Sequence, residues 1–70
     1  MVALTELDEL YKTTISKLRK ESRLSYCTKH LDTIQSVLVK NAGTLDRNQK
    51  EQLKEIIEAT QREIEKLNRQ

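Results

Sequence analysis

The stretch VKNAGTLDRNQ, residues 39–49, holds the only glycine of a 70-residue chain that has no proline. Apolar residues with helical spacing precede it in HLDTIQSVLVK and resume after it in EQLKEIIEATQREIEKL. Gly43 stands where a left-handed residue commonly closes a helix, and Asp46 with Gln49 has the spacing of a capping box for the next helix. A loop of about four residues between two helices favours an antiparallel pair. The stretch therefore predicts a helical hairpin.

The two helices on either side of this loop carry matching apolar stripes. The stripe in residues 46–69 has the 4-3-4-3 spacing of a heptad seam, and residues 24–42 repeat it as 3-4-3-4. Cys27 occupies a seam position, where a small thiol packs like a hydrophobic residue, and so does Thr60. We expect the stripes to face each other as a core or self-association seam. Its residues are Leu24, Leu31, Ile34, Leu38, Leu53, Ile57, Ile64 and Leu67.

A third apolar stripe upstream predicts a helix over residues 5–21, with Thr5 and Asp8 as a weak capping box. If that helix continued straight into residues 24–42, the two stripes would point to nearly opposite sides. One solution is a turn near residues 21–25, which gives a small three-helix bundle. The alternative is a long N-terminal helix that forms a helical-hairpin dimer with the C-terminal helix. We expect the first: an all-α, coiled-coil-like fold in which residues 1–70 form one domain with helices at 5–21, 24–42 and 46–69.

Composition limits what such a chain can do. Hydrophobic residues make up 36% of it, and Phe and Trp are absent, so its core is small and gains from a partner. The single cysteine allows no internal disulfide, and Cys27 with His30 cannot complete a four-ligand zinc site. We expect no metal and no cofactor. No apolar run approaches the ~20 residues of a membrane span, and the acidic start MVALTELDEL is unlike a secretory signal. A lone thiol is typical of an intracellular protein of the cytoplasm or nucleus.

The function that these features favour is binding rather than catalysis. Cys27 and His30 have the spacing of a thiol catalyst and its base on one helix face, but the seam position of Cys27 favours packing. We therefore expect a non-catalytic protein–protein interaction or oligomerisation module, an adaptor or scaffold element of a larger intracellular assembly. Its partner would be another protein chain or a second copy. The expected partner-binding residues are Leu4, Leu7, Leu10, Tyr11 and Val39.

The alternative is a small basic helical domain that binds nucleic acid. Residues 10–42 carry seven basic and two acidic side chains, and basic clusters attract phosphates. No helix-turn-helix signature or aromatic stacking platform accompanies them, which makes nucleic acid the less favoured partner. The contacts in this alternative would be Lys17, Arg19, Lys20, Arg23 and Lys29.

Overall fold

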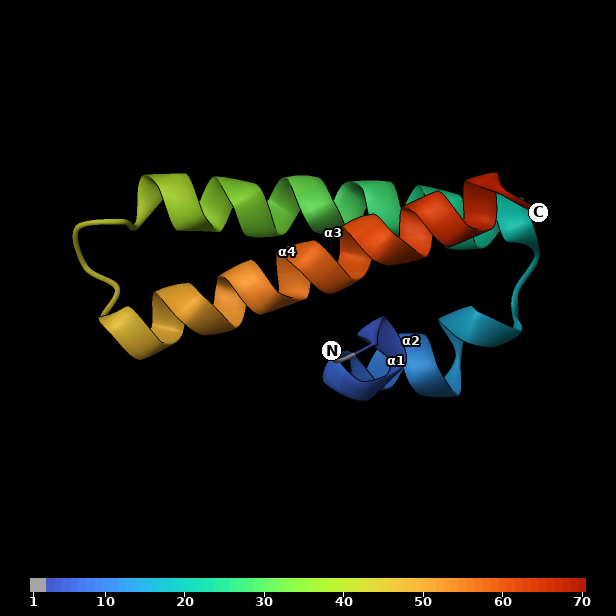
Figure 1. Cartoon of the computed structure of the whole chain (residues 1–70), viewed down its shortest axis with the longest axis horizontal. Helices are drawn as coiled ribbons and strands as arrows, with labels where there is room; N and C mark the ends of the chain where they lie inside the picture. The colour runs from blue at the N-terminus through green and yellow to red at the C-terminus, as the bar shows by residue number, and fades with distance from the viewer. Residues whose placement is uncertain (1–2) are drawn as a thin grey trace.

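The structure is a computed structural model that describes residues 3–70, and those residues form helices and turns without a strand (Figure 1). The predicted all-α class is confirmed. In chain order the elements are α1 (Leu4–Leu7), α2 (Glu9–Thr13), the 3-10 helix η1 (Ile15–Lys17), α3 (Lys20–Lys40) and α4 (Arg47–Asn68).

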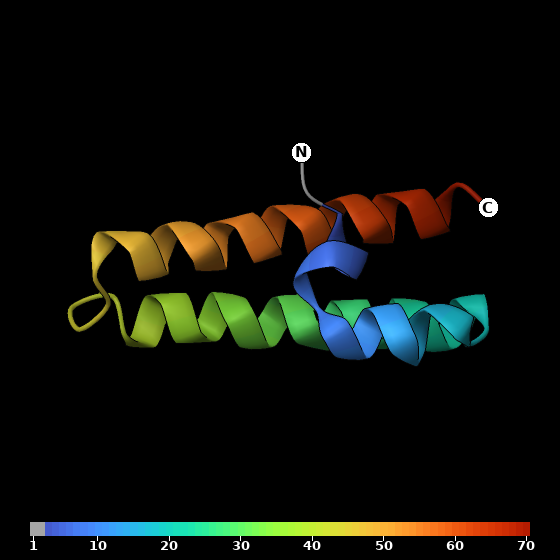
Figure 2. The ribbon, with the colours of Figure 1, turned by 90° about the horizontal axis from the view of Figure 1, so that it is seen from below.

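The two long helices form the frame of the molecule. Helices α3 and α4 pack side by side and run in opposite directions (Figures 1 and 2). The start of α3 meets the end of α4, where Lys20 Nζ donates a hydrogen bond to the Gln70 carbonyl at 2.8 Å. This frame sets the elongated shape, with extents of 38 × 20 × 19 Å.

The start of α4 follows directly from its sequence. The Gln49 N–H donates to Asp46 Oδ1 at 2.8 Å, and the Asp46 N–H donates to Gln49 Oε1 at 3.0 Å. Two backbone donors that the helix itself leaves unpaired are thus satisfied by one reciprocal pair of side chains. The predicted capping box is confirmed.

The end of α3 differs from the prediction. Gly43 does not have a positive φ, and a Cβ built on it would meet nothing within 4 Å. The helix ends at Lys40, and the turn is closed by the Asn41 carbonyl, which accepts from the N–H groups of Thr44 and Leu45, both at 3.0 Å. Because these bonds close the turn without a left-handed residue, the prediction of a left-handed glycine cap is wrong.

The predicted helix over residues 5–21 is also wrong as a single unit. Helix α1 starts after Ala3 without a side-chain cap, so Thr5 does not cap it. Asp8 interrupts the helix because its carboxylate accepts the Tyr11 N–H at 3.2 Å and caps α2 instead. Helix α2 ends at Thr13, where a run of β-branched residues that disfavour helix begins. The turn expected near residues 21–25 comes earlier, at 18–19, so α3 starts sooner than predicted.

The N-terminal segment, residues 3–17, covers only one half of the α3/α4 pair (Figure 2). We call residues 20–30 and 59–68 the proximal half and residues 31–58 the distal half. No residue from 28 to 58 is fully buried. The buried core therefore lies between the segment and the proximal half, and it consists of Leu4, Tyr11, Cys27, Ala59, Thr60 and Leu67.

This uneven core predicts uneven mutational costs along α4. Leu67 is 0% exposed, so Leu67→Ala should lower the free energy of unfolding by about 2–5 kcal/mol. Ile57 lies in the distal half and is only half-buried, so Ile57→Ala should cost clearly less. Chemical denaturation of both variants measures the difference. Equal losses would contradict a core confined to the proximal half.

The geometry of the α3–α4 turn predicts that Gly43→Ala raises the free energy of unfolding by about 0.4–1 kcal/mol. Alanine fits the native backbone there and restricts the unfolded chain. Ala42→Gly, the reverse change at the neighbouring exposed position, is the matched control and should destabilise. Thermal or chemical denaturation measures both changes. A loss of stability in Gly43→Ala would mean that Gly43 has the left-handed conformation after all.

Candidate functional site

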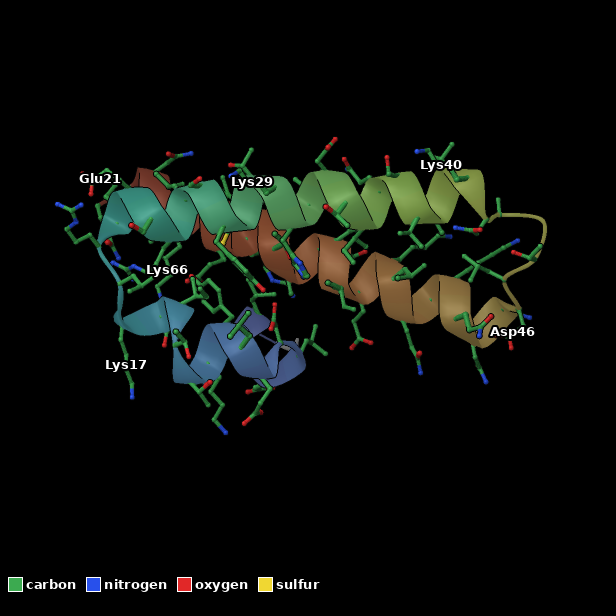
Figure 3. All side chains as sticks on the ribbon, turned by 180° about the vertical axis from the view of Figure 1, so that it is seen from behind. Lys17, Glu21, Lys29, Lys40, Asp46 and Lys66 are labelled. Carbon is green, nitrogen blue, oxygen red and sulfur yellow. The ribbon has the colours of Figure 1, made fainter. Side chains whose placement is uncertain are left out.

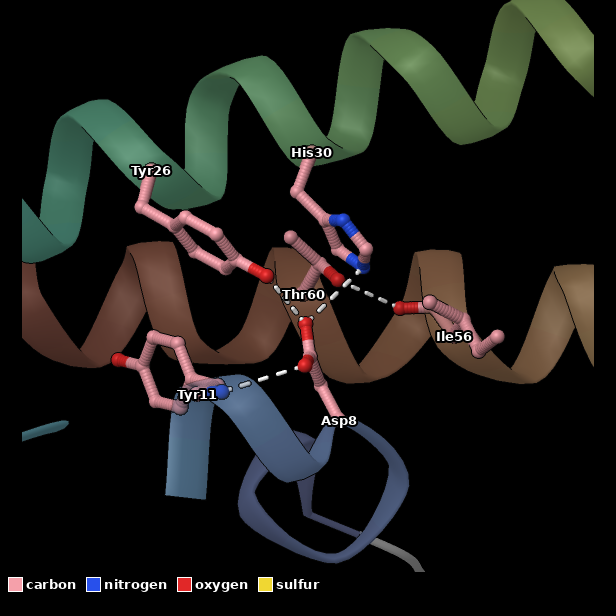
Figure 4. Close-up of polar contacts among 6 residues, drawn as sticks. All are labelled: Asp8, Tyr11, Tyr26, His30, Ile56 and Thr60. Atoms are coloured by element: carbon pink, nitrogen blue, oxygen red, sulfur yellow. Dashed lines mark hydrogen bonds and ion pairs between the residues drawn. The ribbon is translucent and has the colours of Figure 1, made fainter. Parts of the chain in front are cut away.

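A cluster of polar side chains joins the N-terminal segment to α3, as Figure 4 shows, and through Glu63 to α4. Asp8 lies at its centre. Its Oδ1 accepts the Tyr11 N–H, while its Oδ2 accepts the Tyr26 hydroxyl at 2.5 Å and lies 3.6 Å from His30 Nε2. One carboxylate therefore caps α2 and at the same time holds it against α3. We call Asp8, Tyr11, Tyr26, His30 and Glu63 the polar latch.

The aromatic members of the latch extend the contact to α4. Tyr11 is 0% exposed, and its hydroxyl donates to Glu63 Oε2 at 2.5 Å. The rings of Tyr11 and Tyr26 lie 5.8 Å apart, and those of Tyr26 and His30 are stacked at 5.5 Å with an interplanar angle of 13°. These distances are within the range of attractive aromatic pairs. The latch thus combines contacts between the rings with hydrogen bonds from the tyrosine hydroxyls to Glu63 and Asp8.

The surroundings of these groups keep them protonated. Burial, together with the hydrogen bond to Glu63, raises the pKa of Tyr11 well above its usual value. Burial and the hydrogen bond to Asp8 raise the pKa of Tyr26 to about 12. Burial also raises the pKa of the Cys27 thiol, although the hydrogen bond with Tyr11 acts in the opposite direction. The two hydroxyls therefore act as donors to carboxylates at neutral pH.

The structure places Cys27 and His30 in different surroundings. Cys27 is 0% exposed beside Tyr11, whereas His30 faces Asp8. The expectation that Cys27 packs as a small hydrophobic residue is confirmed. A buried thiol with a raised pKa is a poor nucleophile, because the thiolate is the reactive form. Two buried side-chain nitrogens in residues 3–70 have no hydrogen-bond partner, Arg23 Nε and His30 Nε2.

Other kinds of site are sparse in the described chain. Within residues 3–70, His, Cys, Asp and Glu side chains do not gather in groups of three or more that could hold a metal ion. Among the described helices, none has both the length and the apolar character needed to cross a membrane. An open surface depression on α4 lies away from the latch and is lined by Glu51, Lys54, Glu55 and Glu58.

The predicted partner-binding residues do not form one surface. Leu4 and Tyr11 are buried against α3 and α4, and Leu7 packs partly buried beside them. Leu10 is 53% exposed on α2 in the proximal half, and Val39 is 77% exposed near the far end of α3. The two exposed members are therefore separated along the length of the molecule.

The predicted seam is buried unevenly. Leu67 is fully buried, and Leu24 and Ile64 pack against the buried core. Thr60 is buried too, and its hydroxyl donates to the Ile56 carbonyl at 2.7 Å, which satisfies it within its own helix. The remaining seam residues all lie in the distal half and are only half-buried: Leu31, Ile34, Leu38, Leu53 and Ile57.

The basic residues of the nucleic-acid alternative are spread over several elements. Lys17 lies on η1 and Lys29 well along α3, as Figure 3 shows, while Arg19 precedes α3. Lys20 is held by the Gln70 carbonyl, and Arg23 is half-buried. Two of the five basic side chains are therefore partly engaged within the fold, Lys20 and Arg23.

An apolar surface continues the line of the latch, and it combines two predicted seam residues with two residues that the sequence prediction did not assign. Val37 lies two helical turns beyond His30, and Ile56 lies two turns before Glu63, so both face the same side as the N-terminal segment. Ile34 and Leu53 flank them, and all four are half-buried. We call Ile34, Val37, Leu53 and Ile56 the distal apolar face. The feature of the sequence that could have indicated this face is that Val37 and Ile56 are apolar but fall outside the narrow heptad seam.

The contacts of the latch were not predicted, although Tyr11 was expected to bind a partner and Asp8 to take part in a capping box. Tyr26 lies off the apolar stripe of its helix, which marks it as a residue with another partner, but nothing in the local pattern points to Asp8. The chain matches no protein-family model, no curated protein and no solved structure. Its function is therefore inferred from its own residues.

The latch predicts how stability depends on alkaline pH. The pKa of Tyr26 is about 12 in the folded chain against 10.0 ordinarily, so its protonated form stabilises the fold. That contribution is complete below the ordinary pKa and is lost as pH rises toward the folded value. The free energy of unfolding should therefore fall above about pH 10. Because Tyr11 and Tyr26 are the only tyrosines, tyrosinate absorbance reports both.

The same titration has two controls. In denaturant the absorbance should titrate near the ordinary pKa, and in Tyr26→Phe the remaining signal belongs to Tyr11. Folded wild-type protein whose tyrosines titrate at the ordinary value would contradict the hydrogen bonds to Asp8 and Glu63.

Proposed function

We propose that this chain is a non-catalytic protein–protein interaction or oligomerisation module that binds another protein chain through its distal apolar face. The observation that carries the proposal is the unequal cover of the α3/α4 pair. The N-terminal segment buries the proximal half, whereas the apolar residues along the same side of the distal half remain half-buried. In this view the proximal half is a small three-helix bundle, and the distal half is an antiparallel, coiled-coil-like hairpin that a partner completes.

The energetics favour a partner at this surface. Apolar area removed from water contributes about 25 cal/mol per Å², and a second chain would bury the exposed part of four large aliphatic side chains. Apolar residues recurring at helical spacing are the pattern by which helix faces bind one another. Exposed polar side chains border this face, such as Lys40 one turn after Val37 and Gln52 one turn before Ile56, and would set the register of the partner. Affinity would come from the apolar centre and selectivity from its polar border.

The chemistry of the latch supports binding over catalysis. Its hydroxyls are committed to Asp8 and Glu63, and the neighbouring Cys27 thiol is buried in protonated form. General bases and nucleophiles need accessible atoms with pKa values suited to their task. The latch residues are instead arranged to hold the N-terminal segment in place. The nucleic-acid alternative has weaker support because Lys20 is held by the Gln70 carbonyl and Arg23 is half-buried.

The first candidate partner is a second copy of the chain, which sedimentation equilibrium over a wide concentration range tests. We expect a reversible dimer. Val37→Asp should weaken it by at least about tenfold, because a charge would be buried at the contact. Val39→Asp is the matched control, since it makes the same change two residues away on an exposed position of the opposite side. Val39→Asp should leave the association constant unchanged.

The outcomes distinguish the two candidate surfaces. Loss of the dimer in Val39→Asp but not in Val37→Asp would move the contact to the residue that sequence analysis assigned. If Val37→Asp fails to fold, Val37→Thr, which is close to valine in shape, tests the contact in its place. Circular dichroism at the same concentrations shows whether each variant is folded. A wild-type chain that stays monomeric throughout would overturn self-association through this face.

A further inference from the structure

We propose that the N-terminal segment, residues 3–17, exchanges between two copies of the chain, so that each copy closes the proximal core of the other. This inference rests on the connection at residues 18–19 and on the latch. It does not use the distal apolar face and therefore stands apart from the function proposed above. The partner is a second copy because its segment carries the same Leu4 and Tyr11 side chains that are buried in this core.

The segment is attached in a way that allows release. Within residues 3–70, every backbone hydrogen bond recorded for the segment is local, and none connects it to the backbone of α3 or α4. Its ties to the long helices are side-chain contacts, chiefly the latch and the buried Leu4 and Tyr11. Releasing the segment breaks no backbone hydrogen bond to α3 or α4, so the free-energy cost of release comes from these side-chain contacts alone.

Release of the segment would expose part of the proximal core to water, and the same segment of another copy could bury it again. Cys27, Ala59, Thr60 and Leu67 are fully buried in the closed chain and lie in the proximal half that the segment covers. Asp8 and Tyr11 of another copy would make the hydrogen bonds to Tyr26 and Glu63 that the chain's own residues make. Exchange of an identical element creates no new contacts, and for that reason it is a low-cost route to a dimer.

The connection to α3 is suited to straightening. Residues 3–40 contain neither glycine nor proline, and α3 begins after Arg19 without a side-chain cap. Extending α3 toward the N-terminus would pair N–H groups that now lack helical partners. The β-branched residues after α2 oppose this by at most roughly 0.7 kcal/mol each. In a straight extension the apolar stripe of the segment points away from its own α4, so only another copy can receive it.

The directions of the elements fit a closed pair. The segment runs opposite to the α3 on which it packs (Figures 1 and 2). After exchange each segment would continue the line of its own α3, so the two α3 helices would be antiparallel. A two-fold axis perpendicular to the helices produces this arrangement and makes the two exchanged contacts identical. Such a pair closes as a dimer and leaves no segment unpaired.

Arg19→Pro tests this proposal directly. Arg19 has φ −64° and ψ 159°, and Leu18 before it is extended at φ −84° and ψ 171°. Proline and the residue before it adopt these angles readily, and no recorded hydrogen bond within residues 3–70 uses the Arg19 N–H. The substitution therefore preserves the closed turn but forbids a continuous helix. Arg19→Ala is the matched control, because it removes the same charge and leaves the helix free to form.

The experiment refolds wild type, Arg19→Pro and Arg19→Ala from denaturant at high protein concentration, followed by dilution and size-exclusion chromatography with light scattering. We expect wild type and Arg19→Ala to yield a dimer that dissociates slowly, because each segment must leave its partner. The dimerisation constant of Arg19→Pro should fall by at least about 100-fold, the factor by which proline disfavours a helix interior. Its monomer should keep the helical circular dichroism of the wild-type monomer.

Two results would overturn the exchange: as much dimer in Arg19→Pro as in wild type, or no dimer of the wild type after concentrated refolding. Val37→Asp separates this proposal from the previous one. The exchanged dimer should survive that substitution, whereas a dimer through the distal apolar face should survive Arg19→Pro. A refolded dimer that is lost in Val37→Asp and kept in Arg19→Pro would assign it to the distal apolar face.

Discussion

The arrangement of this chain depends on one carboxylate. Asp8 stops α1, caps α2 and accepts the Tyr26 hydroxyl, so that a single side chain both breaks the first helix and fastens α2 to α3. Aspartate suits this task because its short side chain competes with the helix for backbone N–H groups. The chain reverses direction at residues 18–19, and the bond from Asp8 to Tyr26 holds the segment against α3. Tyr11 then reaches Glu63 on the last helix.

The consequence is a molecule with one closed end and one open end. The N-terminal segment covers the half that holds the start of α3 and the end of α4, and the aliphatic residues beyond it stay half-buried. The interaction surface proposed above lies where this cover ends. In the proposed exchange, the segment of one copy would supply the same Leu4 and Tyr11 side chains to the proximal core of the other.

Much of the frame could be read from local patterns. The apolar spacing of the two long helices, the Asp46–Gln49 capping box and the seam position of Cys27 depend on neighbours within one or two turns. The prediction for Gly43 failed because Asn41 closes the turn with right-handed geometry, a choice that glycine permits but does not require. The prediction for residues 5–21 failed because helical periodicity continues through Asp8 although the helix does not.

The sequence by itself determined that this chain is helical, where its two long helices lie and which of their stripes are apolar. These properties are set by contacts between residues three or four positions apart. Only the tertiary structure decided where the N-terminal segment packs, which half of the seam is buried and which apolar residues stay half-buried. Those choices depend on the bonds from Tyr26 to Asp8, 18 residues apart, and from Tyr11 to Glu63, 52 residues apart. No local pattern records such pairs, because their partners meet only once the chain has folded.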